Sequence, residues 1–176
     1  EVSEVQGIEV MICLDVSNSM LASSTDDPKG VSRLQRAKLV LEKLIDKLDN
    51  DKVGLIVFAG DAYTQHPITS DFVSAKMFLN KAIIIITDGE SFDDDPIAAT
   101  KAAVKHGIQV DVIGLGSTKG ALIPIGTNGQ FLKDENGSPV TTRLDEEMAQ
   151  TIAREGEGIY VQGASSTVVK DISEQL

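Results

Sequence analysis

The sequence has 176 residues, which is enough for one domain with a substantial buried core. Its formal net charge of −11 argues against a nucleic-acid partner, because contact with phosphates requires a basic surface, and it suits a site that attracts cations. The single cysteine, Cys13, excludes an internal disulfide, and neither His66 nor His106 has a partner at zinc-ligand spacing. No run approaches the roughly 20 apolar residues of a membrane-spanning helix.

Apolar runs typical of buried strands alternate along the chain with amphipathic segments typical of helices, which predicts an α/β sheet covered by helices on both faces. Residues 8–14 form the first run, which is nearly unbroken and predicts a strand buried on both sides, with Cys13 in the core. Ser32 and Gln35 form a capping box that predicts the start of a helix. The apolar stripe of this helix comprises Leu34, Ala37, Leu41, Leu44, Ile45 and Leu48.

The second half of the chain continues the alternation. Further strands are predicted at residues 53–58, 82–86, 108–113 and, more briefly, 158–161. Asp95-Pro96 starts a helix that Gly107 ends, and the acidic run 93–95 suits the positive end of the helix dipole better than a second metal site. The last two helices are expected at residues 144–156 and 166–176. Between residues 113 and 144, a segment rich in Gly, Asn and Pro predicts an inserted β-hairpin, at about residues 120–142.

Two acidic motifs directly follow buried strands. Asp15-Val16-Ser17-Asn18-Ser19 follows residues 8–14, and Thr87-Asp88-Gly89-Glu90 follows residues 82–86. Ligands of open α/β sheets bind outside the carboxyl ends of the strands, so both motifs are expected at one rim, within reach of a shared ion. Each motif alone is a common turn pattern, and the prediction depends on finding both in one α/β chain.

The residue types of the two motifs suit a hard cation. We predict four metal ligands, Asp15, Ser17, Ser19 and Asp88, the last of them binding directly or through water. Magnesium prefers six oxygen ligands and keeps several waters, so few protein ligands suffice, and manganese or calcium are the alternatives. Only one or two carboxylates face the ion, which should remain electrophilic toward an outside anion. An Asp or Glu carboxylate of a partner protein is therefore the expected sixth ligand.

The combination of Asp15-Val16-Ser17-Asn18-Ser19-Met20 with Ile86-Thr87-Asp88-Gly89-Glu90 resembles the metal-ion-dependent adhesion site of von Willebrand factor type A domains. The resemblance covers nearly the whole chain, as one domain over residues 1–176. It implies a Rossmann-like, doubly wound and mostly parallel sheet with one antiparallel edge strand and a bound magnesium. It also implies a protein-interaction module that is not an enzyme.

Further stretches are similar to bacterial Bat aerotolerance proteins, namely Arg33-Leu34-Gln35-Arg36-Ala37-Lys38, residues 51–60 and Pro67-Ile68-Thr69-Ser70-Asp71. This similarity implies the soluble, periplasmic part of a protein that flanking helices anchor in the bacterial inner membrane. It implies other Bat proteins or a MoxR-like ATPase as partners. The chain lacks a Gly-x-x-x-x-Gly-Lys-Ser/Thr loop, so as an accessory domain of a MoxR-like or chelatase ATPase it would leave nucleotide chemistry to another subunit.

The sequence departs from the family in one place. The metal-binding threonine of the family lies in a Gly-Thr loop, and no such loop occurs between Phe72 and Ala82; Thr69 matches a different loop. The tight link at Gly60 predicts that residues 62–66 run antiparallel to residues 53–58, so a helix at 70–80 would end at the metal rim. The next strand must start at the opposite rim, roughly 17–20 Å away. We therefore predict that the native protein has about 20–35 more residues between Asn80 and Lys81.

The main alternative is a magnesium-dependent phosphohydrolase of the haloacid-dehalogenase type, in which an aspartate after the first strand attacks phosphorus. Such enzymes need a second aspartate two positions further on, where this sequence has Ser17. A serine hydrolase is also disfavoured, because neither Ser17 nor Ser19 lies in a Gly-x-Ser-x-Gly elbow.

Overall fold

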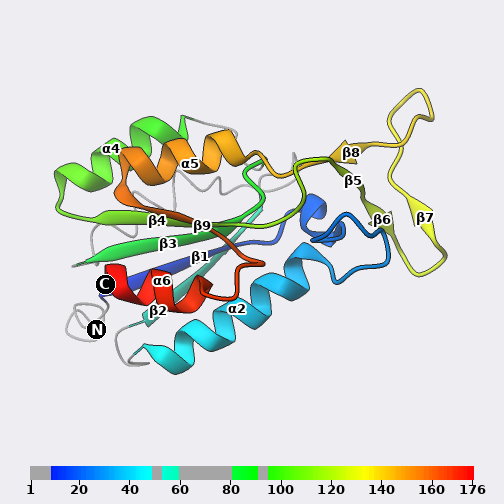
Figure 1. Ribbon diagram of the computed structural model, residues 1–176. Coiled ribbons are helices and arrows are strands. Elements are labelled where there is room, and N and C mark those ends of the chain that lie inside the picture. Colours follow the sequence, from blue (N-terminus) through cyan, green and yellow to red (C-terminus); the bar gives the residue numbers. More distant parts are fainter. Residues whose placement is uncertain (1–8, 49–52, 60–80, 91–94) are drawn as a thin grey trace, which may run out of the picture.

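A computed structural model describes residues 9–48, 53–59, 81–90 and 95–176 of the chain. Its centre is a parallel sheet of five strands in the order β2-β1-β3-β4-β9 (Figure 1). The strands are β1 (Val10–Asp15), β2 (Val53–Phe58), β3 (Ala82–Thr87), β4 (Gln109–Gly114) and β9 (Glu157–Gln162). The predicted α/β class and each of the five predicted strands are confirmed, with ends that differ by one or two residues.

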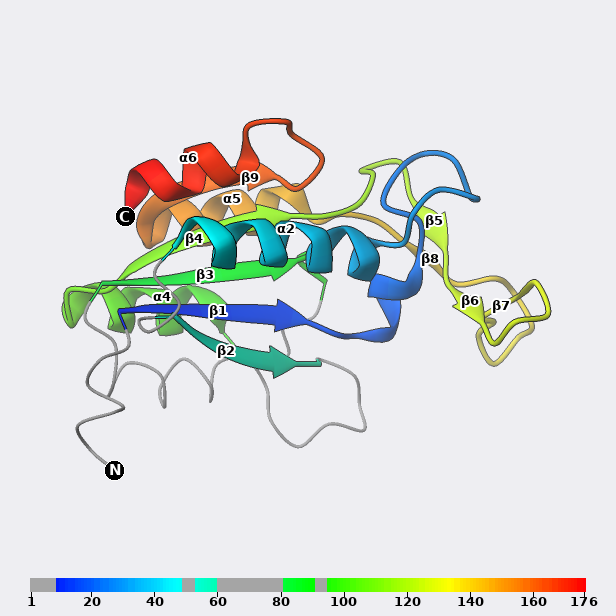
Figure 2. The same cartoon turned by 90° about the horizontal axis from the view of Figure 1, so that it is seen from below.

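Helices cover both faces of the sheet, as predicted (Figures 1 and 2). Helices α2 (Arg33–Lys47) and α6 (Val168–Gln175) pack on one face, and α4 (Pro96–Lys105) and α5 (Glu146–Glu155) on the other. The predicted starts are present, since the Ser32 hydroxyl accepts a hydrogen bond from the Gln35 amide at 3.1 Å and Asp95 caps α4 through the Ile97 and Ala98 amides. None of the helices in these parts of the chain is long and apolar enough to cross a membrane.

The core forms because β1 and β3 are buried at every position. Side chains alternate between the two faces, so Ile12 and Ile84 pack with α2 and α6 while Cys13 and Ile83 pack with α4 and α5. Strand β2 differs from the prediction of a strand buried on both sides. Its Leu55 and Val57 side chains are 51% and 58% exposed, because β2 is the last strand of the described sheet and these residues lie beyond the cover of α2.

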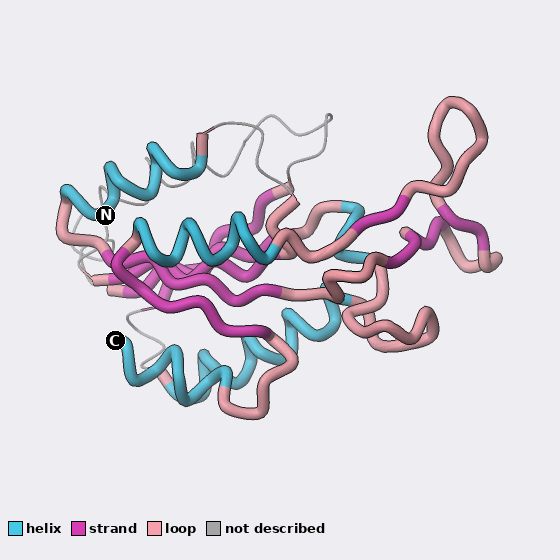
Figure 3. Tube along the Cα trace, turned by 45° about the horizontal axis from the view of Figure 1, so that its top comes forward, coloured by secondary structure: helices cyan, strands magenta, loops and turns pink. Residues whose placement is uncertain are grey.

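The predicted insertion lies between β4 and α5, over residues 121–142, and is called the inserted hairpin below. Strand β5 (Ala121–Leu122) pairs antiparallel with β8 (Thr141–Thr142), and β6 (Pro124–Ile125) pairs with β7 (Gln130–Phe131). Figures 2 and 3 show that the inserted hairpin projects beyond the carboxyl ends of the parallel strands. It therefore extends the rim at which both acidic motifs were expected.

Several predictions lie outside the described residues. They are the antiparallel edge strand at 62–66, the helix at 70–80, and His66 and Thr69. The predicted gap after Asn80 is untested for the same reason and stays a prediction.

A candidate metal site at the carboxyl edge of the sheet

The central strands β1 and β3 are direct neighbours in the sheet and bring the two acidic motifs together. Leu14 is opposite Ile86 in the parallel register, so the residues that follow them leave the sheet side by side. The Thr87 hydroxyl donates a hydrogen bond to Asp15 Oδ2 at 2.7 Å, and both side chains are fully buried. The first residues of the two motifs, Asp15 and Thr87, are thus in contact with each other, at the rim where ligands of open α/β sheets bind.

The chain after Asp15 turns back over this carboxylate. Both the amide and the hydroxyl of Ser17 donate to Asp15 Oδ1, the amide at 2.9 Å. This is the local turn that an aspartate makes with the amide two residues further on. The short 3₁₀ helix η1 (Asn18–Leu21) follows, with Ser19 half-buried in its first turn. The hydroxyl of Ser17 is therefore held beside the carboxylate, and Ser19 follows two residues later in the same turn.

Asp88 is also fully buried and is held from two sides. Its Oδ1 accepts from the Glu90 amide at 3.1 Å, and its Oδ2 accepts from the Arg33 guanidinium at 3.0 Å. Gly89, between them, has φ +80°, and a Cβ there would lie 2.7 Å from the Asp145 carbonyl oxygen. Only glycine fits this turn without displacing the start of α5.

Arg33 is a buried residue of the candidate site that the sequence alone did not reveal. Its side chain is fully buried, and besides the ion pair with Asp88 it donates to the Thr142 hydroxyl at 2.9 Å and the Thr142 carbonyl at 3.1 Å. It also reaches the carbonyl of Ser19 at 3.4 Å. A charged residue in the first turn of a helix normally predicts a solvated position, and the only signal was the Arg33–Lys38 stretch quoted for the family resemblance. Gly116 makes room for the guanidinium, since a Cβ there would lie 2.6 Å from Arg33 Nε.

Glu90 ties the base of the inserted hairpin to the same network. Its carboxylate accepts from the Thr142 hydroxyl and, at 3.0 Å, from the Arg143 amide. Thr142 is 1% exposed and is bonded to both Arg33 and Glu90. The base of the inserted hairpin is thus anchored by two side chains, that of Arg33, which contacts Asp88, and that of Glu90, two residues after Asp88.

The electrostatics of the site favour an added cation. Burial raises the pKa of Asp15 to about 6, and repulsion by the Asp88 carboxylate adds to this, while the hydrogen bonds from Ser17 and Thr87 partly oppose it. The Arg33 guanidinium pairs with Asp88 at 3.0 Å and offsets the charge of that carboxylate. A divalent ion beside Asp15 would relieve both the desolvation and the repulsion.

The residues present fit a hard, oxygen-binding ion. Asp15 supplies a carboxylate, and Ser17 and Ser19 supply hydroxyls from one turn. Asp88, unlike Asp15, is already paired with a guanidinium in the described residues, that of Arg33, which suits a contact with the ion through water more than direct ligation. The described residues contain no group of three or more His, Cys, Asp or Glu side chains that could hold a metal. A site with two carboxylates and neutral oxygens suits magnesium rather than zinc.

Comparisons with known proteins agree with this architecture. The sequence model of the von Willebrand factor type A domain matches residues 10–108. An aerotolerance-related membrane protein from Bacteroides fragilis, solved with multiple mutations to serine, is 38% identical, with a TM-score of 0.83 over 96% of this chain and 98% of that chain. BatB from Bacteroides thetaiotaomicron, a conserved hypothetical protein, is also 38% identical, with a TM-score of 0.80 over the same shares.

A curated relative extends the comparison beyond Bacteroides. It is an uncharacterized protein from Borreliella burgdorferi, 26% identical in an alignment 146 positions long that covers 64% of this chain. The alignment spans 42% of the length of that relative, so the relative has further regions that this chain does not match. The match of the family model over more than half of the chain, together with the two solved structures, shows that this chain belongs to the von Willebrand factor type A domain family and is similar to Bat aerotolerance proteins.

Proposed function

We propose that this chain is a non-enzymatic interaction module that docks partner proteins through a divalent metal held by Asp15, Ser17, Ser19 and Asp88. The observation that carries the proposal is the contact between the two strand ends, in which Thr87 bonds to Asp15 and the buried Asp15 carboxylate is repelled by the buried carboxylate of Asp88. Magnesium is the expected ion, with manganese or calcium as alternatives.

The protein's own residues would hold the ion and leave one side of it accessible. Asp15 and the hydroxyls of Ser17 and Ser19 are the direct ligands on this proposal, and Asp88 acts through water. Bound magnesium supplies a centre that attracts an outside carboxylate. The Arg33 ion pair fixes the orientation of Asp88, and the turn at Gly89 keeps its backbone in place.

The arrangement gives no support to catalysis. Ser17 stands where a dehalogenase-type phosphatase needs its second aspartate, and its hydroxyl donates to Asp15. His106 is the only histidine among the described residues, and it is exposed at the end of α4 with its ring against the Ala102 carbonyl. Within the described residues, the site therefore offers carboxylates and hydroxyls for binding an ion but no histidine positioned to activate a serine.

The solved relatives suggest the cellular setting. One of them is named a membrane protein related to aerotolerance. We propose that this chain is the soluble part of a Bat-type protein anchored in the bacterial inner membrane, with the domain in the periplasm. Its partners on this proposal are other Bat proteins or a MoxR-like ATPase, each offering an Asp or Glu carboxylate.

Thermal unfolding with EDTA and with millimolar magnesium tests the metal site. An ion at about 100 times its dissociation constant adds about 2.7 kcal/mol to the free energy of unfolding, which should be visible as a higher melting temperature. Asp15→Ala should lose most of this gain. Asp111→Asn is the matched control, because Asp111 is an equally buried carboxylate in mid-strand β4 that should not affect the ion. Identical melting temperatures of the wild type in both buffers would refute the proposal.

A further inference from the structure

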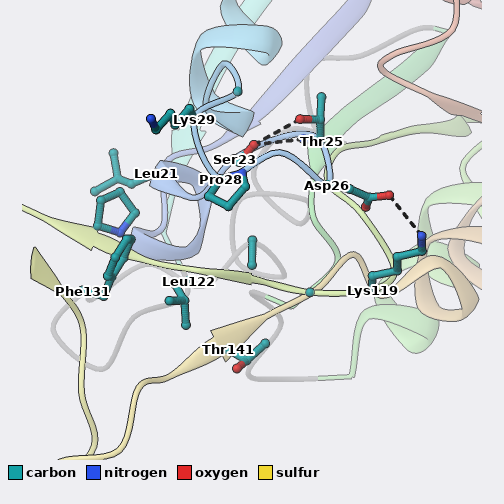
Figure 4. A pocket seen from close by; sticks show the side chains of 14 residues that line it. Leu21, Ser23, Thr25, Asp26, Pro28, Lys29, Lys119, Leu122, Phe131 and Thr141 are labelled. Carbon is teal, nitrogen blue, oxygen red and sulfur yellow. Dashed lines mark hydrogen bonds and ion pairs between the residues drawn. The ribbon is translucent and has the colours of Figure 1, made fainter. Parts of the chain in front are cut away.

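A hollow of about 410 Å³ lies between the inserted hairpin and the loop that follows η1. Figure 4 shows Leu21, Leu122 and Phe131 gathered at one side of it, and the Lys119–Asp26 ion pair at the other. These three apolar side chains are 42%, 37% and 37% exposed. Apolar groups that line a hollow of this size, rather than standing singly on a surface, indicate a binding site.

A second hollow connects this surface to the metal motif. It has a volume of about 260 Å³, shares Leu21 and Pro124 with the first, and continues along Ile125 to Asn18. Asn18 is the residue between Ser17 and Ser19, two of the proposed metal ligands. The two hollows together are called the hairpin groove below, and this groove starts at the turn that would hold the ion.

The charge at the hairpin groove is opposite to that of the protein as a whole. The chain has a formal net charge of −11, yet the groove is lined by Lys29 and Lys119 against one carboxylate, Asp26. Lys119 pairs with Asp26 at 3.4 Å, and Lys29 is exposed with no acidic partner in the described parts of the chain. A ligand that follows the groove away from the metal would therefore be attracted by further acidic groups.

Hydrogen bonds attach the groove to the metal site. Thr141 lines the larger hollow, and its neighbour Thr142 is bonded to Arg33 and, through its hydroxyl, to Glu90. Arg33 in turn holds Asp88 and reaches the Ser19 carbonyl. The floor of the groove and the proposed ligands are thus parts of one fixed surface rather than separate patches.

We propose that the hairpin groove is the second half of the docking surface and that it binds an extended segment of the partner protein. This segment supplies one carboxylate to the metal, places an apolar side chain against Leu21, Leu122 and Phe131, and carries a further acidic residue toward Lys29. The proposal rests on the metal-dependent docking proposed above and adds the chemistry that selects the partner. The metal alone would accept any exposed carboxylate, and the groove restricts it to acidic-apolar segments.

A phage-displayed library of random linear peptides, selected on the magnesium-loaded protein, tests this inference. Enriched peptides should contain an acidic residue near an apolar one, and their affinities can be measured by fluorescence polarisation. Leu122→Ser and Phe131→Ser should each weaken binding at least about tenfold, since an apolar contact of this size is lost. Lys29→Glu should weaken the binding of peptides with a second acidic residue.

Leu39→Ser is the matched control, because Leu39 is a comparably exposed apolar residue, at 48%, on α2 and outside the groove. The Leu39→Ser variant should bind the selected peptides with the affinity of the wild type. All variants should keep the magnesium-induced rise in melting temperature. Peptides that bind Phe131→Ser and wild type equally would overturn the groove while leaving the metal proposal standing. A library that enriches no peptide, or only peptides that bind equally in EDTA, would also overturn it. Light scattering that shows a dimer of the wild type and a monomer of Phe131→Ser would overturn it as well, because the groove would then be covered by a second copy of this chain.

Discussion

Replacing Asp15 by Asn should have opposite effects on stability in the absence and presence of magnesium. In the metal-free protein the Asp15 carboxylate is buried beside Asp88, which raises its pKa from 3.8 to about 6. A raised folded-state pKa means that the folded state binds the proton more tightly than the unfolded state. The contribution of Asp15 to the free energy of unfolding is therefore fully present below about pH 4 and is lost as pH rises through about 6.

The size of this loss follows from the two pKa values. The difference between 3.8 and about 6 corresponds to about 3 kcal/mol at neutral pH. Asn has the same shape, can still accept the Ser17 amide through Oδ1, and carries no charge. In EDTA at neutral pH we therefore expect Asp15→Asn to be more stable than the wild type by up to about 3 kcal/mol, or roughly 6–12 °C in melting temperature for a chain of this size.

Magnesium should reverse the order. The wild type gains the binding free energy of the ion, and the Asn variant lacks the charged ligand, so the two stability curves should converge as magnesium is titrated. They should cross once the gain exceeds about 3 kcal/mol, which requires the ion at more than about 100 times its dissociation constant. Below about pH 5 the gain should fade, because the ion competes with the proton on Asp15. Urea unfolding across pH, with and without EDTA, measures both effects.

Asp111→Asn separates charge burial from metal binding. Burial raises the pKa of Asp111 as well, so its replacement should also stabilise the protein at neutral pH, yet its response to magnesium should equal that of the wild type. If Asp15→Asn is less stable than the wild type in EDTA at neutral pH, the assignment of a strained, metal-free carboxylate pair at this rim is wrong.

Three further results are expected. Arg33→Met leaves the buried Asp88 carboxylate without its ion pair and should lower the free energy of unfolding by about 3–5 kcal/mol, part of which magnesium restores; unchanged urea midpoints would contradict this. The purified protein should hydrolyse neither phosphate esters nor peptides, and turnover that disappears in Asp15→Asn would overturn the binding-module proposal. The native gene should encode about 20–35 further residues between Asn80 and Lys81. A gene in which the codon for Lys81 directly follows that for Asn80 would show that the predicted direction of the edge strand is wrong.

The sequence was sufficient to place Asp15 and Asp88 at one rim, because both follow apolar runs that can only be buried strands. Parallel strands that leave the sheet at the same edge then bring their following residues together, whatever the details of the loops. The caps at Ser32 and Asp95 were predictable for a similar reason, since in each the side chain accepts a hydrogen bond from a backbone amide three residues later. Signals that are local in the sequence thus gave the framework of both the fold and the candidate site.

The features that could not be predicted depend on contacts between distant segments. Arg33 lies 55 residues before Asp88 and 109 before Thr142, and nothing near Arg33 in the sequence indicates that its guanidinium is buried. The hairpin groove likewise exists only because η1 and the loop after it lie beside the inserted hairpin about 100 residues later, which places Leu21 and Phe131 at the same side of the groove. The exposure of Leu55 and Val57 follows from the place of β2 in the sheet order, which its own composition does not determine.

Arg33 has a further role if the proposed docking function is correct, because it would help a site with two buried carboxylates to attract a third from outside. Without the guanidinium, Asp15 and Asp88 would together neutralise a divalent ion, and a partner's carboxylate would meet no net charge. Because Arg33 pairs with Asp88 at 3.0 Å, it offsets the charge of one carboxylate, so an ion bound beside Asp15 would keep more of its positive charge than it would without the guanidinium. In a buried setting that charge is screened less than on an open surface, so it favours one incoming carboxylate strongly. On the proposed mechanism, the ion pair that orients Asp88 is therefore also what keeps the metal receptive to the partner.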